Sequence, residues 1–296
     1  TAAQRKWAAL HSGDDEPPEG MGVNVDEESH AVQSISDVRV DSFVDSRWNQ
    51  KTASAYSGTT DYCYNYYTPN HYYSGCVATA LSQMMWYFKK PTGSVTAATY
   101  ACKVDGVTTN ATMKGGVYDF ANMPAKPWVS GVTEAQRAAI GKLVYDVGVT
   151  VGMNWKSGGS SASLYVGQTA LEEDFGYAQA VALAYQNDSP WDYYPWSLDV
   201  FKQVVIPCLD ARTPVGLSIE RPSGGGHAVF ADGYGYSSGD FYLHLNFGWG
   251  YSSDTQTAWY CPPDLNTNNY DYDTIKGILC NVFPDKTGNI FSGRVL

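Results

Sequence analysis

The segment after residue 75 carries apolar residues at helical spacing. Its stripe consists of Val77, Leu81, Met84 and Phe88. Residues three or four positions apart share one side of a helix, so this segment has an apolar face to bury. Proline follows at position 91 and cannot continue a helix, because it lacks a backbone N–H. The pattern predicts an amphipathic helix over Cys76–Lys90.

A second helix is predicted over Glu134–Val147. Thr133 and Gln136 have the spacing of a capping box, in which two side chains satisfy free N–H groups of the first turn. The apolar stripe that follows consists of Ile140, Leu143, Val144 and Val147. We expect shorter helices near Ser163–Phe175 and Ser197–Val205.

The C-terminal third changes to the two-residue period of β-strands. Three predicted strands cover Pro214–Ile219, His227–Asp232 and Phe241–Phe247. In the last of them aromatic and leucine residues alternate with polar ones, as on a half-buried strand. The loop GYGYSSG between the last two strands predicts a β-hairpin. Helices followed by an antiparallel sheet indicate an α+β fold.

Composition indicates a sizeable core and excludes several classes of protein. Apolar residues make up 44% of the 296 residues and charged residues 17%, which excludes wholesale disorder. The formal charge of −11 repels phosphate backbones, so we expect no nucleic-acid partner. No apolar run approaches the ~18 residues of a membrane span. The six cysteines contain no C-x-x-C pair, so we expect neither a metal nor a cofactor.

The first 35 residues differ from the rest of the chain. Seven acidic and two basic residues give this segment a charge of −5, and it contains the stretch DDEPPEG. We expect an acidic tail or linker over 1–35, because such a segment has little apolar surface to bury. One domain is expected over 36–285, with a helical part at about 70–180 and a sheet part at about 210–285. Residues 286–296 are expected to form a C-terminal tail.

Cys76 is the first candidate for chemistry. It stands at the predicted N-terminus of a helix, where free N–H groups and the helix dipole stabilise a thiolate. Gly75 leaves space for a substrate to approach. From this context alone a buried structural cysteine is the stronger interpretation, because free cysteines are commonly buried.

His227 and Asn246 complete a possible catalytic set. His227 follows a run of three glycines and opens a predicted strand, although an ordinary strand-edge histidine fits the same pattern. If the hairpin pairs His227 with Asn246, the amide would orient the imidazole, as in a nucleophile–base–orienter arrangement. His244 shares the face of Asn246 and is a rival base. It lacks a glycine opening, so we rank it second and expect a structural role.

Several motifs in order resemble the streptopain-type cysteine peptidases, peptidase family C10. The segment SGCVATALSQMMWYFKKP at 74–91 resembles the family's nucleophile helix. GGHAVFADGY at 225–234 resembles its histidine strand, HLNFGWG at 244–250 its HVNWGWG strand, and WNQ at 48–50 its mature N-terminal segment. The resemblance runs from about residue 38 to about residue 283. It implies a papain-like fold, with a helical subdomain that carries the cysteine and a sheet subdomain that carries the histidine.

The resemblance also implies roles for individual residues. Cys76 would be the nucleophile and His227 the general base, later the general acid. Gln50 would join the backbone N–H of Cys76 as an oxyanion donor, Asn246 would orient the histidine, and Trp249 would shield that contact from water. Two further positions match residues that line the substrate cleft, Ser161 and Gly226.

The activity implied is that of a secreted cysteine endopeptidase that hydrolyses extended polypeptides through a thiolate–imidazolium pair and a thioacyl-enzyme intermediate. Its cleft would favour an apolar side chain at the second residue before the scissile bond. The resemblance also implies a monomer that is secreted or cell-surface in a bacterium and made as a zymogen, with its own prodomain as inhibitor. Residues 1–35 would then be a propeptide remnant. A cloning-boundary tail is the other interpretation of that segment.

Two other classes of function stay open at this stage. One is an inactive binding or adhesion module on the same fold, and the other is a cysteine-dependent acyltransferase or amidase. Retention of all five expected catalytic residues argues against the first. Departures from the family pattern are Phe247 in place of tryptophan, an extra glycine at Gly224, and YSSDTQTAWY after Gly250. The segment after Gly250 belongs to a loop expected to border the cleft, so the substrate specificity stays open.

Overall fold

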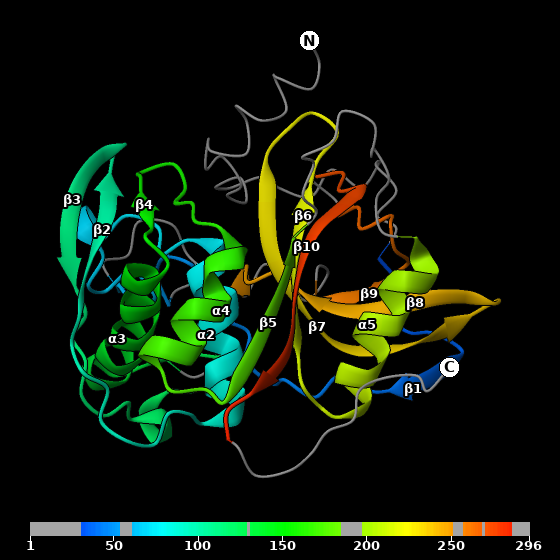
Figure 1. The fold of residues 1–296 in the computed structure, drawn as a ribbon, viewed down its shortest axis with the longest axis horizontal. Helices are drawn as coiled ribbons and strands as arrows, with labels where there is room; N and C mark the ends of the chain where they lie inside the picture. The colour runs from blue at the N-terminus through cyan, green and yellow to red at the C-terminus, as the bar shows by residue number, and fades with distance from the viewer. Residues whose placement is uncertain are drawn as a thin grey trace.

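Two parts lie side by side in the protein (Figure 1). The computed structural model describes residues 31–53, 61–128, 131–184, 197–250, 257–267 and 270–285. One part contains helices α2 (Cys76–Phe88), α3 (Glu134–Thr150) and α4 (Gly167–Thr169). The other is a large sheet with helix α5 (Leu198–Asp210) on one side. The α+β architecture expected from the sequence is confirmed.

The large sheet has seven strands, six of them in the order β5-β10-β6-β7-β8-β9, while β1 also pairs with β7. The strands are β1 (Asp37–Val40), β5 (Gln179–Ala184), β6 (Val215–Glu220), β7 (Gly226–Ser237), β8 (Asp240–Asn246), β9 (Ala258–Tyr260) and β10 (Thr274–Phe283). Their pairings are antiparallel. The three predicted strands correspond to β6, β7 and β8, and the hairpin between the last two is confirmed. The other four strands were not expected from the sequence.

A second, smaller sheet belongs to the helical part. It has the order β3-β2-β4, with β2 (Thr99–Val104), β3 (Val107–Thr112) and β4 (Asn154–Trp155). Asp105 and Gly106 connect β2 to β3, with φ of 50° and 80°. Positive φ at both central residues is the requirement of a tight hairpin turn, which Asp-Gly meets. The sequence analysis did not predict this sheet, although its turn signal is present.

Helix α2 begins where the sequence predicts and ends two residues earlier. Lys89 takes a left-handed conformation, with φ of 53°, and its backbone N–H donates to the carbonyls of Met85 and Trp86. This C-cap ends the helix before Pro91 is reached. The apolar stripe of α2 packs against α3 and β7, which places the helix between the two parts of the molecule.

The capping box of α3 is confirmed. The Gln136 N–H donates to Oγ1 of Thr133 at 3.2 Å, and the Thr133 N–H donates to Oε1 of Gln136 at 3.0 Å. The helix continues three residues beyond the prediction, because Gly148, Val149 and Thr150 are also buried.

The two shorter predicted helices differ from expectation in detail. The region near Ser163–Phe175 is a 3₁₀ turn over Leu164–Val166, the short α4, and a π-type turn over Ala170–Asp174. Helix α5 extends to Asp210 and contains Pro207 within it. Cys208 and Leu209, which follow this proline, are buried, so their packing offsets the hydrogen bond that proline removes.

The predicted register of the β7–β8 hairpin is wrong. Asn246 pairs with Phe230, not with His227, and the pairing shifts between Ala231 and Gly233. The turn lies at Ser238 and Gly239, with φ of 53° and 94°, so β7 extends further than expected before the chain reverses. Gly235 pairs with Val38 of β1 and Tyr242 of β8, so it is a strand residue, and the glycine that takes positive φ in the turn is Gly239.

The segment just before β1 contacts the large sheet. Val32 and Trp259 exchange backbone hydrogen bonds of 2.9 Å in both directions. Residues 31–35, expected to belong to the tail, are therefore partly attached to the domain. The rest of that acidic segment, and residues 286–296, lie outside the described residues.

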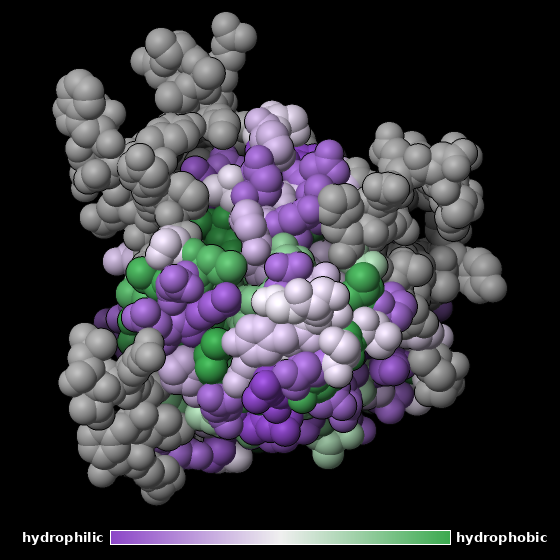
Figure 2. Space-filling view, turned by 90° about the vertical axis from the view of Figure 1, so that its right-hand side faces the viewer, coloured by the Kyte–Doolittle hydropathy of each residue, from purple (hydrophilic) through white to green (hydrophobic). Residues whose placement is uncertain are grey.

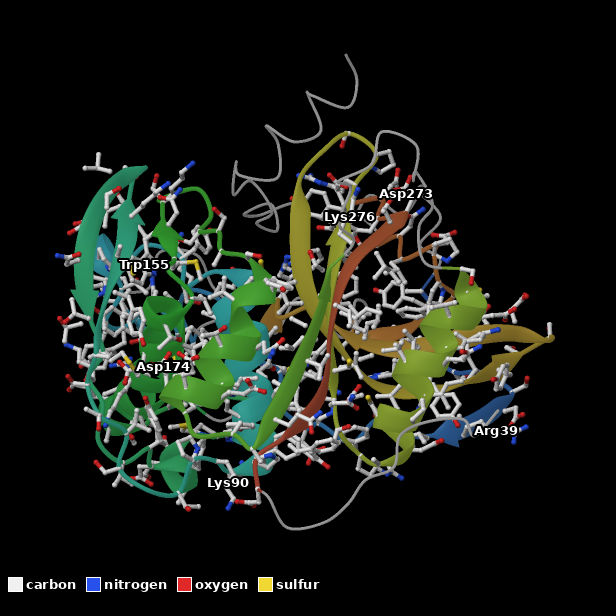
Figure 3. All side chains as sticks on the ribbon, viewed as in Figure 1. Arg39, Lys90, Trp155, Asp174, Asp273 and Lys276 are labelled. Carbon is white, nitrogen blue, oxygen red and sulfur yellow. The ribbon has the colours of Figure 1, made fainter. Side chains whose placement is uncertain are left out.

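Each part has its own apolar core. Trp48 and Trp155 are fully buried in the helical part, and Figure 3 shows Trp155 within it. Trp249 and Phe247 are fully buried in the core of the sheet part. On the face that Figure 2 shows, hydrophobic side chains form separate small areas between polar ones. Within the described residues, no helix is both long and apolar enough to cross a bilayer.

Candidate active site

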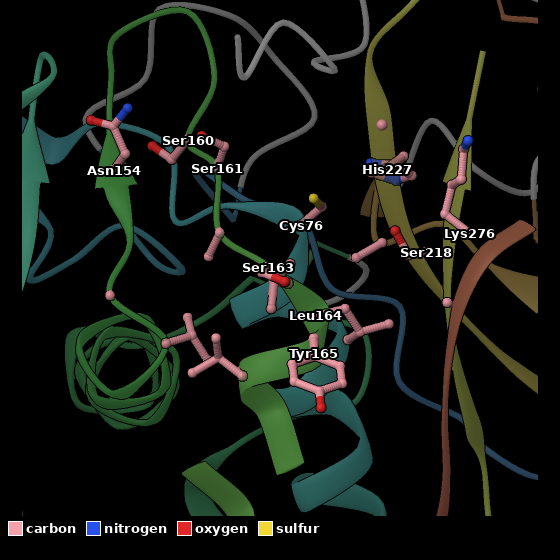
Figure 4. Close-up of a pocket in the computed structure, with 18 of the residues that line it drawn as sticks. Cys76, Asn154, Ser160, Ser161, Ser163, Leu164, Tyr165, Ser218, His227 and Lys276 are labelled. Atoms are coloured by element: carbon pink, nitrogen blue, oxygen red, sulfur yellow. The ribbon is translucent and has the colours of Figure 1, made fainter. Parts of the chain in front are cut away.

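A cleft of about 540 Å³ separates the two parts. Cys76 lines one wall and His227 the other, and Figure 4 shows their side chains facing each other across the opening. The helical wall also includes Gln50 and Ser161, and the sheet wall includes Gly226. The structure thus brings together five of the seven residues that the sequence analysis selected.

Cys76 is the first residue of α2, and no side chain caps that end of the helix. The helix dipole at this end favours an anion at the thiol or above it. Gly75 has φ of 92°, and a Cβ atom there would lie 2.6 Å from Sδ of Met153. Only glycine fits, because both the backbone conformation and the space exclude a side chain.

Gln50 is held against the chain that leads into Cys76. Its carbonyl accepts hydrogen bonds from the backbone N–H of Ser74 at 2.8 Å and from Oγ of Ser74 at 3.0 Å. Gln50 is 2% exposed and lines the cleft beside Cys76. These bonds fix the backbone of Gln50 near the helix N-terminus, and an amide side chain carried there is suited to the role of an oxyanion donor.

The imidazole of His227 is held by a backbone carbonyl. Its Nε2 lies 2.7 Å from the carbonyl oxygen of Phe247. A carbonyl only accepts, so Nε2 carries the proton and Nδ1 holds the lone pair. Nδ1 is buried and has no hydrogen-bond partner among the described residues. The ring therefore has one nitrogen occupied by the sheet part and one available for proton transfer.

The surroundings of His227 disfavour its charged form. Burial lowers the pKa of His227, the hydrogen bond to Phe247 opposes this effect, and the nearby Arg221 cation adds a smaller lowering; together they bring the pKa to about 4. An imidazolium at this position therefore needs a negative partner in the cleft. A thiolate at Cys76 would supply that charge.

Aromatic rings enclose the histidine. The centroid of the Trp249 ring lies 4.8 Å from that of His227, and the rings of Phe247 and Tyr272 follow at 5.9 and 6.2 Å. Trp249 is fully buried. These rings keep water from the imidazole, and they are the source of the desolvation that lowers the pKa of His227.

Asn246 does not make the direct contact with His227 that the hairpin register predicted. Its Nδ2 donates to the carbonyl of Ser46 at 2.8 Å, and its Oδ1 accepts from the backbone N–H of Gly248 at 2.9 Å. The side chain thus closes the turn that presents the Phe247 carbonyl. The role of this carbonyl was not expected from the sequence, because every residue has a carbonyl and only the tertiary structure orients it.

The rival base His244 lies outside the cleft. Its Nδ1 is 2.5 Å from Oδ1 of the fully buried Asp232, and its ring meets Trp259 edge-on. The other oxygen of Asp232 accepts from the backbone N–H of Val44. This pair joins β7, β8 and the segment after β1, which is the structural role that the sequence predicted for His244.

The wall of the cleft on the helical side includes the segment around Ser161. Ser161 exchanges backbone hydrogen bonds with Asn154, at 2.9 and 3.2 Å. Gly226 begins β7 on the opposite wall and pairs with Glu220.

Among the residues that the structure describes, no group of three or more histidine, cysteine or acidic side chains is arranged to hold a metal ion.

The two parts and the cleft between them have the arrangement of a papain-like fold. A helical part and a sheet part meet at a cleft, with a cysteine at a helix N-terminus on one wall and a buried histidine on the other. Comparison with solved structures shows the same papain-like fold in active interpain A, a cysteine protease of Prevotella intermedia. The TM-score is 0.67 at 24% identity, over 82% of this chain and 95% of that one. A prointerpain A fragment matches with a TM-score of 0.61 at 22% identity, over 86% of this chain and 76% of the fragment.

Residues 48–260 match the model of the Peptidase C10 family, and the chain belongs to that family. Streptopain of Streptococcus pyogenes is 33% identical over 192 residues, which are 62% of this chain and 45% of streptopain. The thiol protease/hemagglutinin PrtT of Porphyromonas gingivalis is 28% identical over 179 residues, 60% of this chain and 19% of PrtT. The match thus spans less than half the length of these two relatives.

Proposed function

We propose that the protein is a cysteine endopeptidase that hydrolyses peptide bonds through a thioacyl-enzyme. The observation that carries the proposal is the orientation of His227, which lines the same cleft as Cys76. The Phe247 carbonyl binds its Nε2, and its Nδ1 has no hydrogen-bond partner among the described residues. Membership of the Peptidase C10 family and the names of streptopain and PrtT support the same activity.

In the first step Nδ1 of His227 takes the proton of the Cys76 thiol. The resulting thiolate attacks the scissile carbonyl carbon, and the carbonyl π electrons move onto oxygen. The side-chain amide of Gln50 and the backbone N–H of Cys76 would donate to this oxyanion, and losing one such donor costs about 10²–10³ in rate in related sites. The tetrahedral intermediate then collapses, the C–N bond breaks, and His227 returns the proton to the leaving amine.

In the second step water replaces the amine. His227 takes a proton from water as its oxygen attacks the thioester carbon, and the same donors stabilise the second oxyanion. Collapse breaks the C–S bond and releases a carboxylic acid, and His227 returns its proton to the thiolate. Throughout the cycle the Phe247 carbonyl holds the Nε2–H, so the ring keeps the tautomer and orientation that proton transfer needs.

The preferred substrate would be an extended polypeptide with an apolar residue two positions before the scissile bond. Apolar side chains that line the cleft near His227 support this preference: Leu164, Ala182, Ala228 and Ile278. The location outside the cytoplasm, the monomeric state and inhibition by a prodomain are part of the same proposal. Those three rest on the family resemblance.

An acyltransferase or amidase is the second candidate, because the dyad alone does not decide whether water or an amine attacks the thioester. An inactive module on the same fold is the third. The orientation of His227 and the shielded ring favour a functional dyad over this third candidate.

The test combines labelling with proteolysis. We expect iodoacetamide near pH 7 to modify Cys76 far ahead of Cys63 and Cys102, because burial raises the pKa of both of those thiols, that of Cys102 to about 11. Casein cleavage should be lost in the Cys76→Ala variant. A Cys76 that reacts as slowly as the buried thiols, together with intact casein both before and after residues 1–35 are removed, would overturn the proposal. Removal of residues 1–35 then distinguishes a blocked cleft from an inactive dyad.

A further inference from the structure

Gln83 is a fully buried amide on the helix that carries the nucleophile, seven residues after Cys76. A buried polar side chain costs free energy unless it is hydrogen-bonded, so its partners indicate why it is there. The Oε1 atom of Gln83 accepts from the backbone N–H of Trp48 at 3.0 Å and from Nδ2 of Asn246 at 3.4 Å. One oxygen atom therefore joins three segments that are distant in sequence.

The direction of this amide is fixed by its neighbours. Both Trp48 N–H and Asn246 Nδ2 are donors, so only the oxygen of Gln83 satisfies them. The Nε2 atom is buried and has no hydrogen-bond partner among the described residues. Within the described residues, only the oxygen of the Gln83 side chain makes hydrogen bonds. A residue that merely fills space would make none.

The first segment that Gln83 joins leads to the expected oxyanion donor. Trp48 stands two residues before Gln50, and the carbonyl of Gln50 is bonded to Ser74, just before the nucleophile. The hydrogen bond from Trp48 therefore ties the segment with Gln50 to α2 at a second point. Together the two bonds hold the backbone that carries Gln50 against the segment with the nucleophile.

The second segment holds the histidine. Asn246 closes the turn that continues through Phe247, and the Phe247 carbonyl bonds Nε2 of His227. A Cβ atom at Gly248 would lie 3.1 Å from Thr79 on α2, so this turn rests directly on the helix. Gln83 is the point at which the turn and the helix also share a hydrogen bond.

We propose that Gln83 is a positioning residue, which sets the imidazole of His227 and the amide of Gln50 against Cys76 across the two parts of the molecule. This inference rests on the proposed peptidase function. Gln83 acts through Trp48 and Asn246, and does not line the cleft where substrate binds. Small displacements of catalytic groups lower the rate strongly, so loss of this shared acceptor should reduce turnover more than substrate binding.

The test replaces the acceptor and keeps the volume. We expect Gln83→Met to lower kcat for a peptide substrate about tenfold or more, with KM changed by less than about twofold. Rates are referred to sites counted by stoichiometric alkylation of Cys76, so that misfolded protein does not contribute. The matched control is Ser82→Ala on the same helix, because Ser82 is fully buried and its Oγ has no hydrogen-bond partner among the described residues.

A second variant separates positioning from folding. In Gln83→Glu the new carboxyl group, when protonated, keeps a carbonyl acceptor of the same shape. The kcat of this variant should therefore exceed that of Gln83→Met at low pH. As pH rises, this carboxyl ionises and places a negative charge against the turn that Asn246 closes. The pH profile of kcat should then show a decrease that the wild-type profile lacks. If Gln83→Met does not fold, the decrease in kcat of Gln83→Glu with rising pH tests the positioning role by itself. A Gln83→Glu profile that superimposes on wild type overturns the inference.

The alkylation rate of Cys76 against pH gives a readout that needs no peptidase activity. The profile should shift in Gln83→Met and stay unchanged in Ser82→Ala. If wild type shows a thiolate at neutral pH but cleaves no peptide, the proposed function fails, and the positioning of the thiol and imidazole stands only if the profile shifts in Gln83→Met. If wild type cleaves peptides and Gln83→Met matches it in both kcat and alkylation profile, only the positioning role fails.

Discussion

The Nε2 atom of His227 lies 2.7 Å from the carbonyl oxygen of Phe247. The residue that orients the imidazole does so through its backbone, and the side chain of Asn246 acts one step away, by closing the turn. A backbone acceptor depends on the path of the chain and not on the identity of the residue. Phe247 in place of the tryptophan usual in the family is therefore compatible with this contact.

The first prediction concerns the protonation of His227. In Cys76→Ala the ring has no thiolate partner, so burial and Arg221 should hold its pKa at about 4, as the structure indicates. NMR titration of the imidazole C–H signals measures this value. The ordinary pKa is 6.5, so the unfolded chain binds more protons between pH 4 and 6.5. The free energy of unfolding of this variant should therefore fall as pH decreases through that range.

Wild type provides the comparison for this titration. A thiolate at Cys76 would raise the pKa of His227 above the value in Cys76→Ala, and the difference measures the coupling of the pair. A midpoint near 6.5 in Cys76→Ala would contradict the buried environment of the ring.

The second prediction concerns Trp249, whose ring centroid is 4.8 Å from that of His227. In a Cys76→Ala background, Trp249→Ala should admit water and move the pKa of His227 upward from about 4 toward its ordinary value, because desolvation is the largest cause of the shift. Trp249→Phe keeps an aromatic cover and should leave most of the shift in place. Equal NMR midpoints in the Ala and Phe variants would show that Trp249 does not shield the ring.

The third prediction uses two glycines of positive φ. Gly248→Ala should lower kcat by about tenfold or more, because φ of 69° and contact with Thr79 displace the turn that carries the Phe247 carbonyl. Gly239→Ala is the matched control. It has φ of 94° at the β7–β8 turn, and a Cβ there meets nothing within 4 Å.

Both variants should lose stability by about 1–3 kcal/mol in chemical denaturation, since each strains its backbone. Only Gly248→Ala should lose activity per active site. Equal activities of the two variants would mean that the position of the turn does not affect the dyad.

The fourth prediction concerns stability without function. Thr133→Ala removes the capping box of α3 and should lower the free energy of unfolding by about 1 kcal/mol, measured by urea denaturation. Activity per active site should be unchanged, because Thr133 does not line the cleft. Thr133→Ser keeps the hydroxyl and should retain the stability. A loss of activity in Thr133→Ala would connect this end of α3 to the site.

Local signals in the sequence were sufficient for the elements that carry the candidate residues. Helix α2 begins at Cys76 as its apolar stripe and glycine predict, and the Thr133–Gln136 cap depends on residues three positions apart. Strands β6, β7 and β8 follow from alternation of apolar residues. The family resemblance then indicated which residues belong together, and the cleft lining includes Gln50, Cys76 and His227.

The remaining strands carried weaker local signals. Strands β5 and β10 pair with each other over a sequence separation of about a hundred residues, so their stability comes from partners that no local pattern reveals. The register of the β7–β8 hairpin depended on which glycine formed the turn. The pairing of His227 with Asn246 places the turn next to Gly235, but contact with β1 occupies the space beside Gly235 and the turn lies at Gly239.

The sequence by itself determined the chemical groups of this protein, a thiol at a helix N-terminus and an imidazole on a strand, because residue type and local periodicity are encoded along the chain. The tertiary structure decided how these groups are oriented. The carbonyl of Phe247 on Nε2 of His227, and the oxygen of Gln83 between Trp48 and Asn246, join segments far apart in sequence. Such contacts arise only when the two parts pack against each other, since hydrogen bonds between distant segments depend on the geometry of the whole fold.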